Sequence, residues 1–213
     1  MSRSIFSPDN PLMITMSQIT DCIFLSLFWL VCSFPLVTLG PASAALYDAV
    51  YYGYRKGGKH PWTRFFQSFK SNLKTGILPG ILYLALFCGF GWGLIQVWNA
   101  AVWEQVSFAV FSAAAFVVLL LLGILSVLFP LMSRFHNTFW GLLRNTVLLA
   151  LVNLPRTLGL GFVNAMSILL CVKFVFPVFF LPALSNLINT RFLEPMFKPY
   201  MGEEETETSE DAA

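Results

Sequence analysis

The side chains of this sequence that could carry chemistry are ionisable groups in or beside apolar segments. Asp21 and Lys173 lie within stretches that are otherwise almost uncharged. A charged side chain costs free energy in hydrocarbon, so an ionisable residue in a membrane segment is by default a functional candidate. We therefore consider an intramembrane pair of Asp21 with Lys173. The structural alternatives are a carboxylate near the outer headgroups and a lysine that extends to the membrane surface or lies in a turn.

Asp48 is a second candidate, because aromatic residues accompany it in the sequence. Tyr47 precedes it, Tyr51 follows at helical spacing, and Trp29 begins the same stretch. A carboxylate beside aromatic rings suits a sugar-like ligand, although tyrosines are also common at membrane interfaces. The structural alternative is an ion pair of Asp48 with Arg55 or the lysine after it. The candidates for binding a ligand or a partner are Asp21, Trp29, Tyr47, Asp48, Tyr51 and Lys173.

No motif for catalysis, metal binding or cofactor binding accompanies these residues. The four cysteines all lie in apolar segments, and the two histidines, His60 and His136, are far apart in the sequence. The sequence contains no phosphate-binding P-loop, no metalloprotease motif and no nucleophile-elbow motif. We therefore expect a protein that is not an enzyme and that binds neither a metal nor a cofactor.

The composition indicates an integral membrane protein. Hydrophobic residues make up 57% of the 213 residues and charged residues 11%, whereas a soluble domain has about 25% charged residues. The segment 203–211 holds six of the eleven acidic residues, so the rest of the chain is basic. We expect one membrane domain at residues 1–200 and an acidic disordered tail at 201–213. The cations flank apolar segments, which favours contact with the lipid bilayer and argues against nucleic-acid binding.

The apolar pattern predicts an all-α, polytopic transmembrane helical bundle. Two amphipathic segments, 62–74 and 133–153, predict helices that lie in the membrane interface. The last apolar region is longer than one span needs and contains Pro177 and Pro182, so it is either one kinked helix or two short ones meeting near Lys173. The bundle therefore has four or five spanning helices, expected at residues 12–38, 75–97, 106–132 and 157–188.

The distribution of Lys and Arg predicts the orientation. The connections after the first and the third span are basic, and the connection between the second and third spans has no Lys or Arg. By the positive-inside rule, the basic connections face the cytoplasm and the N-terminus lies on the extracellular side of the cell membrane. The cations expected to contact lipid or to dock a partner are Arg64, Lys70, Lys74 and Arg144.

A short sequence echo suggests a weak parallel internal repeat. Residues 33–36 (SFPL) end the first predicted span, and residues 128–131 (LFPL) end the third. Each motif is followed by an amphipathic segment. Both halves run in the same direction, so the repeat would be parallel and not inverted.

Several motifs in residues 21–75 resemble the YesL-like family of small bacterial integral membrane proteins. They are Trp29-Leu30, PLVTLGP at 35–41, AALY at 44–47 and FFQSFKSNLK at 65–74. The family has an Asn shortly before the tryptophan, where this chain has Ser26. The resemblance covers roughly residues 5–200. It implies a helical membrane protein of undefined biochemical function that accompanies carbohydrate uptake systems, and it brings no catalytic residues to carry over.

These observations favour a non-enzymatic accessory membrane protein. Its partner would be a sugar ABC transporter or a membrane sensor, contacted through the basic amphipathic elements. One alternative is a small-solute transporter or channel that uses Asp21 and Lys173 within the membrane. Another is a lipid-binding scaffold that holds anionic lipid at Arg64, Lys70 and Arg144.

Overall fold

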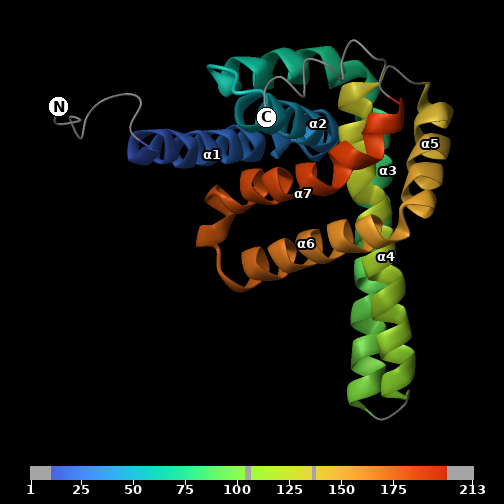
Figure 1. Cartoon of the computed structure of the whole chain (residues 1–213). Coiled ribbons are helices and arrows are strands. Elements are labelled where there is room, and N and C mark those ends of the chain that lie inside the picture. Colours follow the sequence, from blue (N-terminus) through green and yellow to red (C-terminus); the bar gives the residue numbers. More distant parts are fainter. Residues whose placement is uncertain (1–10, 104–106, 136–137, 201–213) are drawn as a thin grey trace.

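The chain forms seven α-helices and no strand within residues 11–103, 107–135 and 138–200, which are the residues that the computed structural model describes (Figure 1). Two short turns flank the second helix, a 3-10 turn at Leu36–Thr38 and a π-helical turn at Tyr51–Arg55. The helices are α1 (Pro11–Ser33), α2 (Leu39–Val50), α3 (Pro61–Val102), α4 (Phe108–Arg134), α5 (Phe139–Val152), α6 (Leu154–Lys173) and α7 (Leu181–Phe197).

Four of these helices, α1, α3, α4 and α6, are long and apolar enough to cross a membrane. This confirms the prediction of an all-α protein with several membrane spans. The region 157–188 is two helices, because α6 ends at Lys173 and α7 begins at Leu181, with Pro177 in the 3-10 turn between them. The two-helix alternative is therefore the one that the structure contains.

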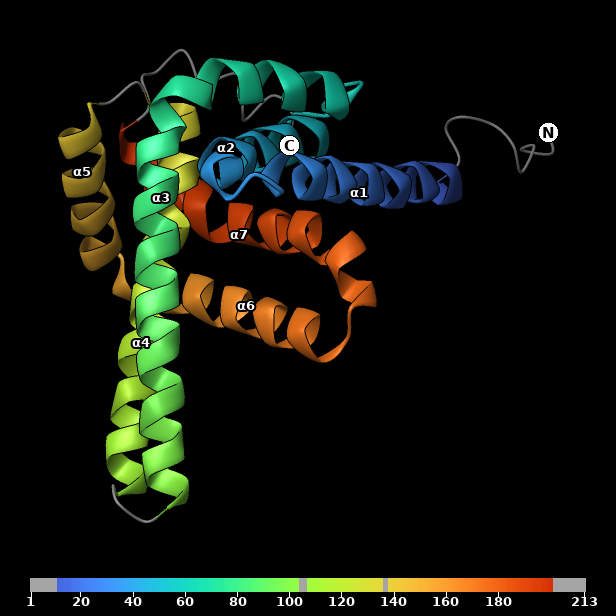
Figure 2. The same ribbon diagram turned by 180° about the vertical axis from the view of Figure 1, so that it is seen from behind.

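The sequence predicted an interfacial helix at 62–74 and a separate span at 75–97. The prediction that these are two helices was wrong. Both segments belong to α3, a helix of 42 residues with Pro79 in its interior. Figures 1 and 2 show its first part lying across the top of the molecule and its second part running downward beside α4. Proline removes a backbone hydrogen bond and bends a helix without ending it when neighbours hold both halves. The predicted segment 133–153 contains a separate helix, α5.

The downward part of α3 and α4 form an antiparallel hairpin that extends beyond the other helices (Figure 1). In both views α1, α6 and α7 run across this hairpin. The four apolar helices are therefore not parallel to one another, and a single membrane normal cannot align with all of them. On α5, the outward face is mainly apolar, with Trp140, Leu148 and Leu151 exposed beside Arg144.

The short helix α2 lies at the centre of the packing. Ten of its twelve residues are buried. Tyr47 and Ala44 belong to a core shared with α4, α5, α6 and α7, whereas Leu46 and Val50 belong to a second core shared with α1, α3 and the start of α7. One small, apolar helix thus connects the N-terminal helices to the C-terminal ones.

Close backbone contact joins α2 to α3. A Cβ atom built on Gly40 would collide with the carbonyl oxygen of Gly76 and would lie 2.8 Å from the Cα atom of Gly80. Similarly, a Cβ atom on Gly123 of α4 would collide with the carbonyl oxygen of Thr157 in α6. Glycine at such crossings lets two helices approach more closely than larger residues allow, which favours van der Waals packing in lipid.

The two motifs of the proposed repeat have different structures. Pro35 lies in the bend between α1 and the following 3-10 turn, whereas Pro130 lies inside α4. The structure therefore gives no support to an internal repeat at these positions.

We predict that Gly40→Ala destabilises the fold. The new methyl group must push α2 away from the backbone of α3, and overpacking of this kind costs about 1–3 kcal/mol. The measurement is thermal unfolding of the purified protein in detergent. Gly91→Ala is the matched control, because nothing lies within 4 Å of a Cβ atom at that position. Equal melting temperatures for both variants would contradict the close contact.

Candidate functional site

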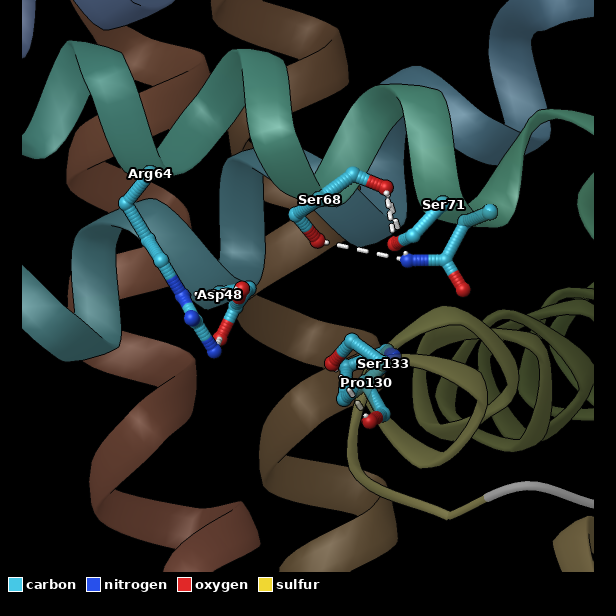
Figure 3. Close-up of polar contacts among 7 residues, drawn as sticks. Asp48, Arg64, Ser68, Ser71, Pro130 and Ser133 are labelled. Atoms are coloured by element: carbon cyan, nitrogen blue, oxygen red, sulfur yellow. Dashed lines mark hydrogen bonds and ion pairs between the residues drawn. The ribbon is translucent and has the colours of Figure 1, made fainter.

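Asp48 forms an ion pair with Arg64 of α3, and not with Arg55 or Lys56 as the sequence alternative proposed (Figure 3). Arg64 Nε donates to Asp48 Oδ2 at 2.8 Å and Arg64 Nη2 donates to Oδ1 at 3.3 Å. The Asp48 side chain is only 7% exposed, whereas that of Arg64 is 47% exposed. Arg55 instead donates to Thr190 Oγ1 of α7 at 3.2 Å. The pair therefore holds α2 against α3 and leaves no free carboxylate for a ligand.

A second polar cluster joins α2, α4 and α7. Tyr47 donates its hydroxyl proton to Glu194 Oε1 at 2.7 Å, and Arg134 Nη2 donates to the same oxygen at 3.0 Å. The Arg134 guanidinium carbon lies 3.5 Å from the ring centre of Tyr51, which stacks on Tyr47. Tyr47 and Tyr51 were predicted as site residues, but Arg134 and Glu194 were not. The sequence signal was present, because Glu194 is the only acidic residue between positions 105 and 202.

Burial dominates the electrostatics of Tyr47. Its side chain is completely buried, and burial together with the nearby Glu194 carboxylate raises its pKa well above the ordinary tyrosine value. Tyr47 therefore stays protonated and remains a hydrogen-bond donor to Glu194. This hydrogen bond stabilises the Glu194 carboxylate in the interior.

A cavity of about 500 Å³ lies beside this cluster, between α1, α2, α3, α4, α6 and α7. This volume is in the range of small-molecule sites, which are about 300–1,000 Å³. Most lining residues are apolar or aromatic, and none of them is Asp, Glu, Lys, Arg or His. The polar lining residues are Ser43, Ser126, Asn164, Ser167, Ser185, Asn186 and Asn189.

Amide and hydroxyl groups form a chain along one wall of the cavity. Asn189 Nδ2 donates to Asn164 Oδ1 at 3.4 Å, and Asn164 Nδ2 donates to Ser126 Oγ at 3.0 Å and to the Leu160 carbonyl at 2.8 Å. Asn189 Oδ1 is buried and has no hydrogen-bond partner within the described residues. The wall therefore ends in an acceptor that is unsatisfied by the protein.

The opposite wall contains Trp29, which was predicted as a binding residue. Its indole Nε1 donates to Ser43 Oγ of α2 at 3.1 Å, and its ring lines the cavity. Ser26, one turn earlier, is fully buried and accepts a hydrogen bond from the backbone nitrogen of Ala183 at 3.1 Å. It thus satisfies one of the free N–H groups at the start of α7. The family's Asn at this point is therefore replaced by a residue that still accepts a hydrogen bond.

The structure does not bring Asp21 and Lys173 together. No ion pair joins them, and neither lines the cavity. Lys173 is exposed at the end of α6, with its Nζ 5.8 Å from the ring centre of Phe174. Asp21 is partly exposed on α1. Lys70, Lys74 and Arg144 are all exposed, as a docking surface requires.

The chemistry that this arrangement supports is binding of an uncharged molecule. Among the described residues, no group of three or more His, Cys, Asp or Glu side chains is placed to hold a metal ion. Two ion pairs, of Glu194 with Arg134 and of Asp48 with Arg64, lie outside the lining of the cavity. The cavity itself presents amide, hydroxyl and indole groups and the thiol of Cys171, together with apolar surface.

We predict that Arg64→Met lowers the free energy of unfolding by about 1–2 kcal/mol, because the buried Asp48 carboxylate loses two hydrogen bonds. The loss is limited because Arg64 is partly exposed to solvent, which weakens the ion pair. Thermal unfolding of the single variant and of the double variant with Asp48→Asn measures the effect. The double variant is expected to regain most of the loss. Lys70→Met, on the exposed face of the same helix, is the control and should unfold like the wild type. If Arg64→Met and Lys70→Met unfold alike, the pair does not stabilise the fold.

We also predict that Tyr47 makes stability fall at alkaline pH. Below about pH 10, the ordinary tyrosine pKa, Tyr47 is protonated in both states and its contribution is intact. Above that pH the unfolded chain loses the proton whereas the folded chain, with its raised pKa, keeps it, so the folded state loses stability as pH rises. Tyr47→Phe has no such proton. Its melting temperature should fall less steeply than that of the wild type between about pH 9 and pH 11, and identical slopes would contradict the raised pKa.

Comparison with known proteins gives a family for the N-terminal part of the chain. Residues 22–93 match the family model described as "Protein of unknown function, DUF624". This match spans the second half of α1, all of α2 and most of α3. No match was found among curated proteins or solved structures. DUF624 is the family of YesL/YteU-like membrane proteins and has no known function, so this match confirms the resemblance seen in the motifs of residues 21–75, and the long apolar helices indicate an integral membrane protein.

Proposed function

We propose that this membrane protein is a non-enzymatic accessory protein that docks a partner through a basic surface at one end of the helical hairpin. The observation that supports this proposal is that the Lys and Arg residues are absent from the helical hairpin and lie at or beyond its ends. The sequence has no Lys or Arg between Lys74 and Arg134, and these two residues bracket the hairpin of α3 and α4. Both of these ends of the hairpin lie at the top of the molecule in Figure 1.

This arrangement supports a cytoplasmic location for the basic end. A cation-free hairpin whose two ends both carry cations fits a segment that enters and leaves the membrane on the same side. By the positive-inside rule, that side is the cytoplasm. The location of the N-terminus outside the cell stays a prediction, as do the orientation and the partner.

The docking surface is the outer face of the first part of α3 and the turn before it. Phe65 and Ser68 face inward and are buried, whereas Lys70 and Lys74 are exposed on the other face with Phe66. Arg64 contributes less, because its guanidinium is bound to Asp48. Exposed cations with interleaved apolar side chains suit an acidic protein segment at the membrane surface. The family resemblance points to a sugar importer subunit as that partner.

The transporter alternative has less support. It depends on Asp21 and Lys173 acting together within the membrane, but no ion pair joins them and neither lines the cavity. The scaffold alternative depends on the same cations as the docking proposal, so the experiment must separate a protein partner from anionic lipid.

We predict that Lys70→Glu with Lys74→Glu abolishes partner binding. Charge reversal places two carboxylates where an acidic partner must approach, which costs affinity and slows association. The measurement is quantitative co-purification of sugar importer subunits with the tagged protein after mild extraction from native membranes. We expect at least a fivefold loss of the subunits with the double variant, and no loss with Lys173→Glu, a control cation at the distant end of α6.

Two results would contradict the proposal. One is recovery of the wild-type protein alone, together with normal sugar uptake in a deletion strain. The other is an unchanged set of co-purified proteins combined with loss of bound anionic lipid in native mass spectrometry of the double variant, which would support the scaffold alternative.

A further inference from the structure

We propose that the cavity of about 500 Å³ binds an uncharged amphiphile from the membrane, whose hydroxyl or amide N–H group donates a hydrogen bond to Asn189 Oδ1. This inference uses residues remote from the basic surface and does not depend on the docking proposal. It rests on three features of the cavity, namely its unsatisfied acceptor, its lack of charge and its apolar opening.

The unsatisfied acceptor indicates that something other than the protein completes the polar wall. Asn189 is 5% exposed, and its Nδ2 is used in the bond to Asn164 whereas its Oδ1 has no partner within the described residues. A buried polar atom without a partner is costly, so native structures almost always satisfy it. The missing partner must be a donor, because the atom that remains free is a carbonyl oxygen.

The lack of charge restricts the class of ligand. None of the cavity-lining residues is Asp, Glu, Lys, Arg or His. A phosphate, carboxylate or ammonium group would lose its hydration here without gaining an opposite charge, which is strongly unfavourable. The hydroxyl and amide groups of the wall, in contrast, can exchange hydrogen bonds with a neutral polar head.

The opening of the cavity indicates where the ligand comes from. Two lining residues, Leu30 at the end of α1 and Val172 at the end of α6, are 38% and 79% exposed. Both helices are apolar enough to cross a membrane, so the rim between them presents apolar side chains to lipid. A molecule that enters here would come from the bilayer with its apolar part toward the rim and its polar head toward Asn189.

The experiment uses the full-length protein in phosphatidylcholine nanodiscs with a photoreactive monoacylglycerol of dodecanoic acid as the probe. After irradiation, mass spectrometry of peptides measures how much of the probe is attached to α6 and α7. Competitors are unlabelled monoacylglycerol, dodecyl phosphate as an anionic amphiphile with the same chain length, and free glycerol as a soluble polyol.

Two variants test the assigned atoms. Asn189→Leu removes the acceptor at similar side-chain size, and Ser167→Phe fills the cavity without touching Asn189. Asn99→Leu, an exposed position on α3, is the matched control. Thermal unfolding of each variant checks that it is folded, and Ser167→Phe keeps the test valid if Asn189→Leu does not fold.

We expect labelling in the wild type that unlabelled monoacylglycerol suppresses and dodecyl phosphate does not. Loss of one hydrogen bond should lower labelling about two- to tenfold in Asn189→Leu, Ser167→Phe should abolish it, and Asn99→Leu should leave it unchanged. Equal labelling in wild type and Ser167→Phe would overturn the proposal, because the probe would then bind outside the cavity. Suppression by free glycerol as strong as by monoacylglycerol would also overturn it, because the ligand would then be a soluble polyol.

Discussion

Arg134 and Glu194 meet at 3.0 Å in a part of the molecule where only 13% and 19% of their side chains are exposed. Neither charge is tolerated alone among apolar helices, so each requires the other and the helices that carry them must stay together. Tyr47 adds a hydrogen bond to the same carboxylate and brings α2 into the contact. The pair thus fixes α4, α2 and α7 relative to one another, and these helices supply much of the cavity wall.

Elsewhere in the fold, several buried polar groups are also satisfied by partners on other helices, but most of these groups carry no charge. Where no charge is buried, the helices approach through glycine, as at Gly40 against Gly76 and Gly80. Where a helix begins inside the protein, a buried side chain satisfies its backbone, as Ser26 does for α7. Asn189 is an exception, because its Oδ1 has no partner among the described residues. Asn189 lies in an uncharged cavity of ligand size, whereas Lys70 and Lys74 lie on the exposed surface, so the two candidate activities occupy separate parts of the molecule.

Much of the fold could be predicted from the sequence, because the length and apolarity of a membrane helix are properties of a single segment. The candidate site could be predicted only in part. Tyr47, Asp48 and Trp29 stand out as polar or aromatic residues in an apolar context, but their partners lie far away in sequence. The pairing of Arg64 with Asp48 was not predicted, because Arg64 was considered only for contact with lipid or a partner. Glu194 was overlooked because its partner Tyr47 lies 147 positions away in the sequence. The continuity of α3 could not be predicted, because one helix with an internal proline at position 79 has the same local pattern as two helices.

The most direct test of this account is a double-mutant cycle on the pair that joins α4 to α7. It compares the unfolding free energies of the wild type, Arg134→Met, Glu194→Gln and the double variant in nanodiscs. The account predicts that the double variant is destabilised by less than the sum of the two single effects, and that this difference, the coupling energy, is about 1–3 kcal/mol. Additive effects, with a coupling energy near zero, would show that the two side chains act independently and would contradict it.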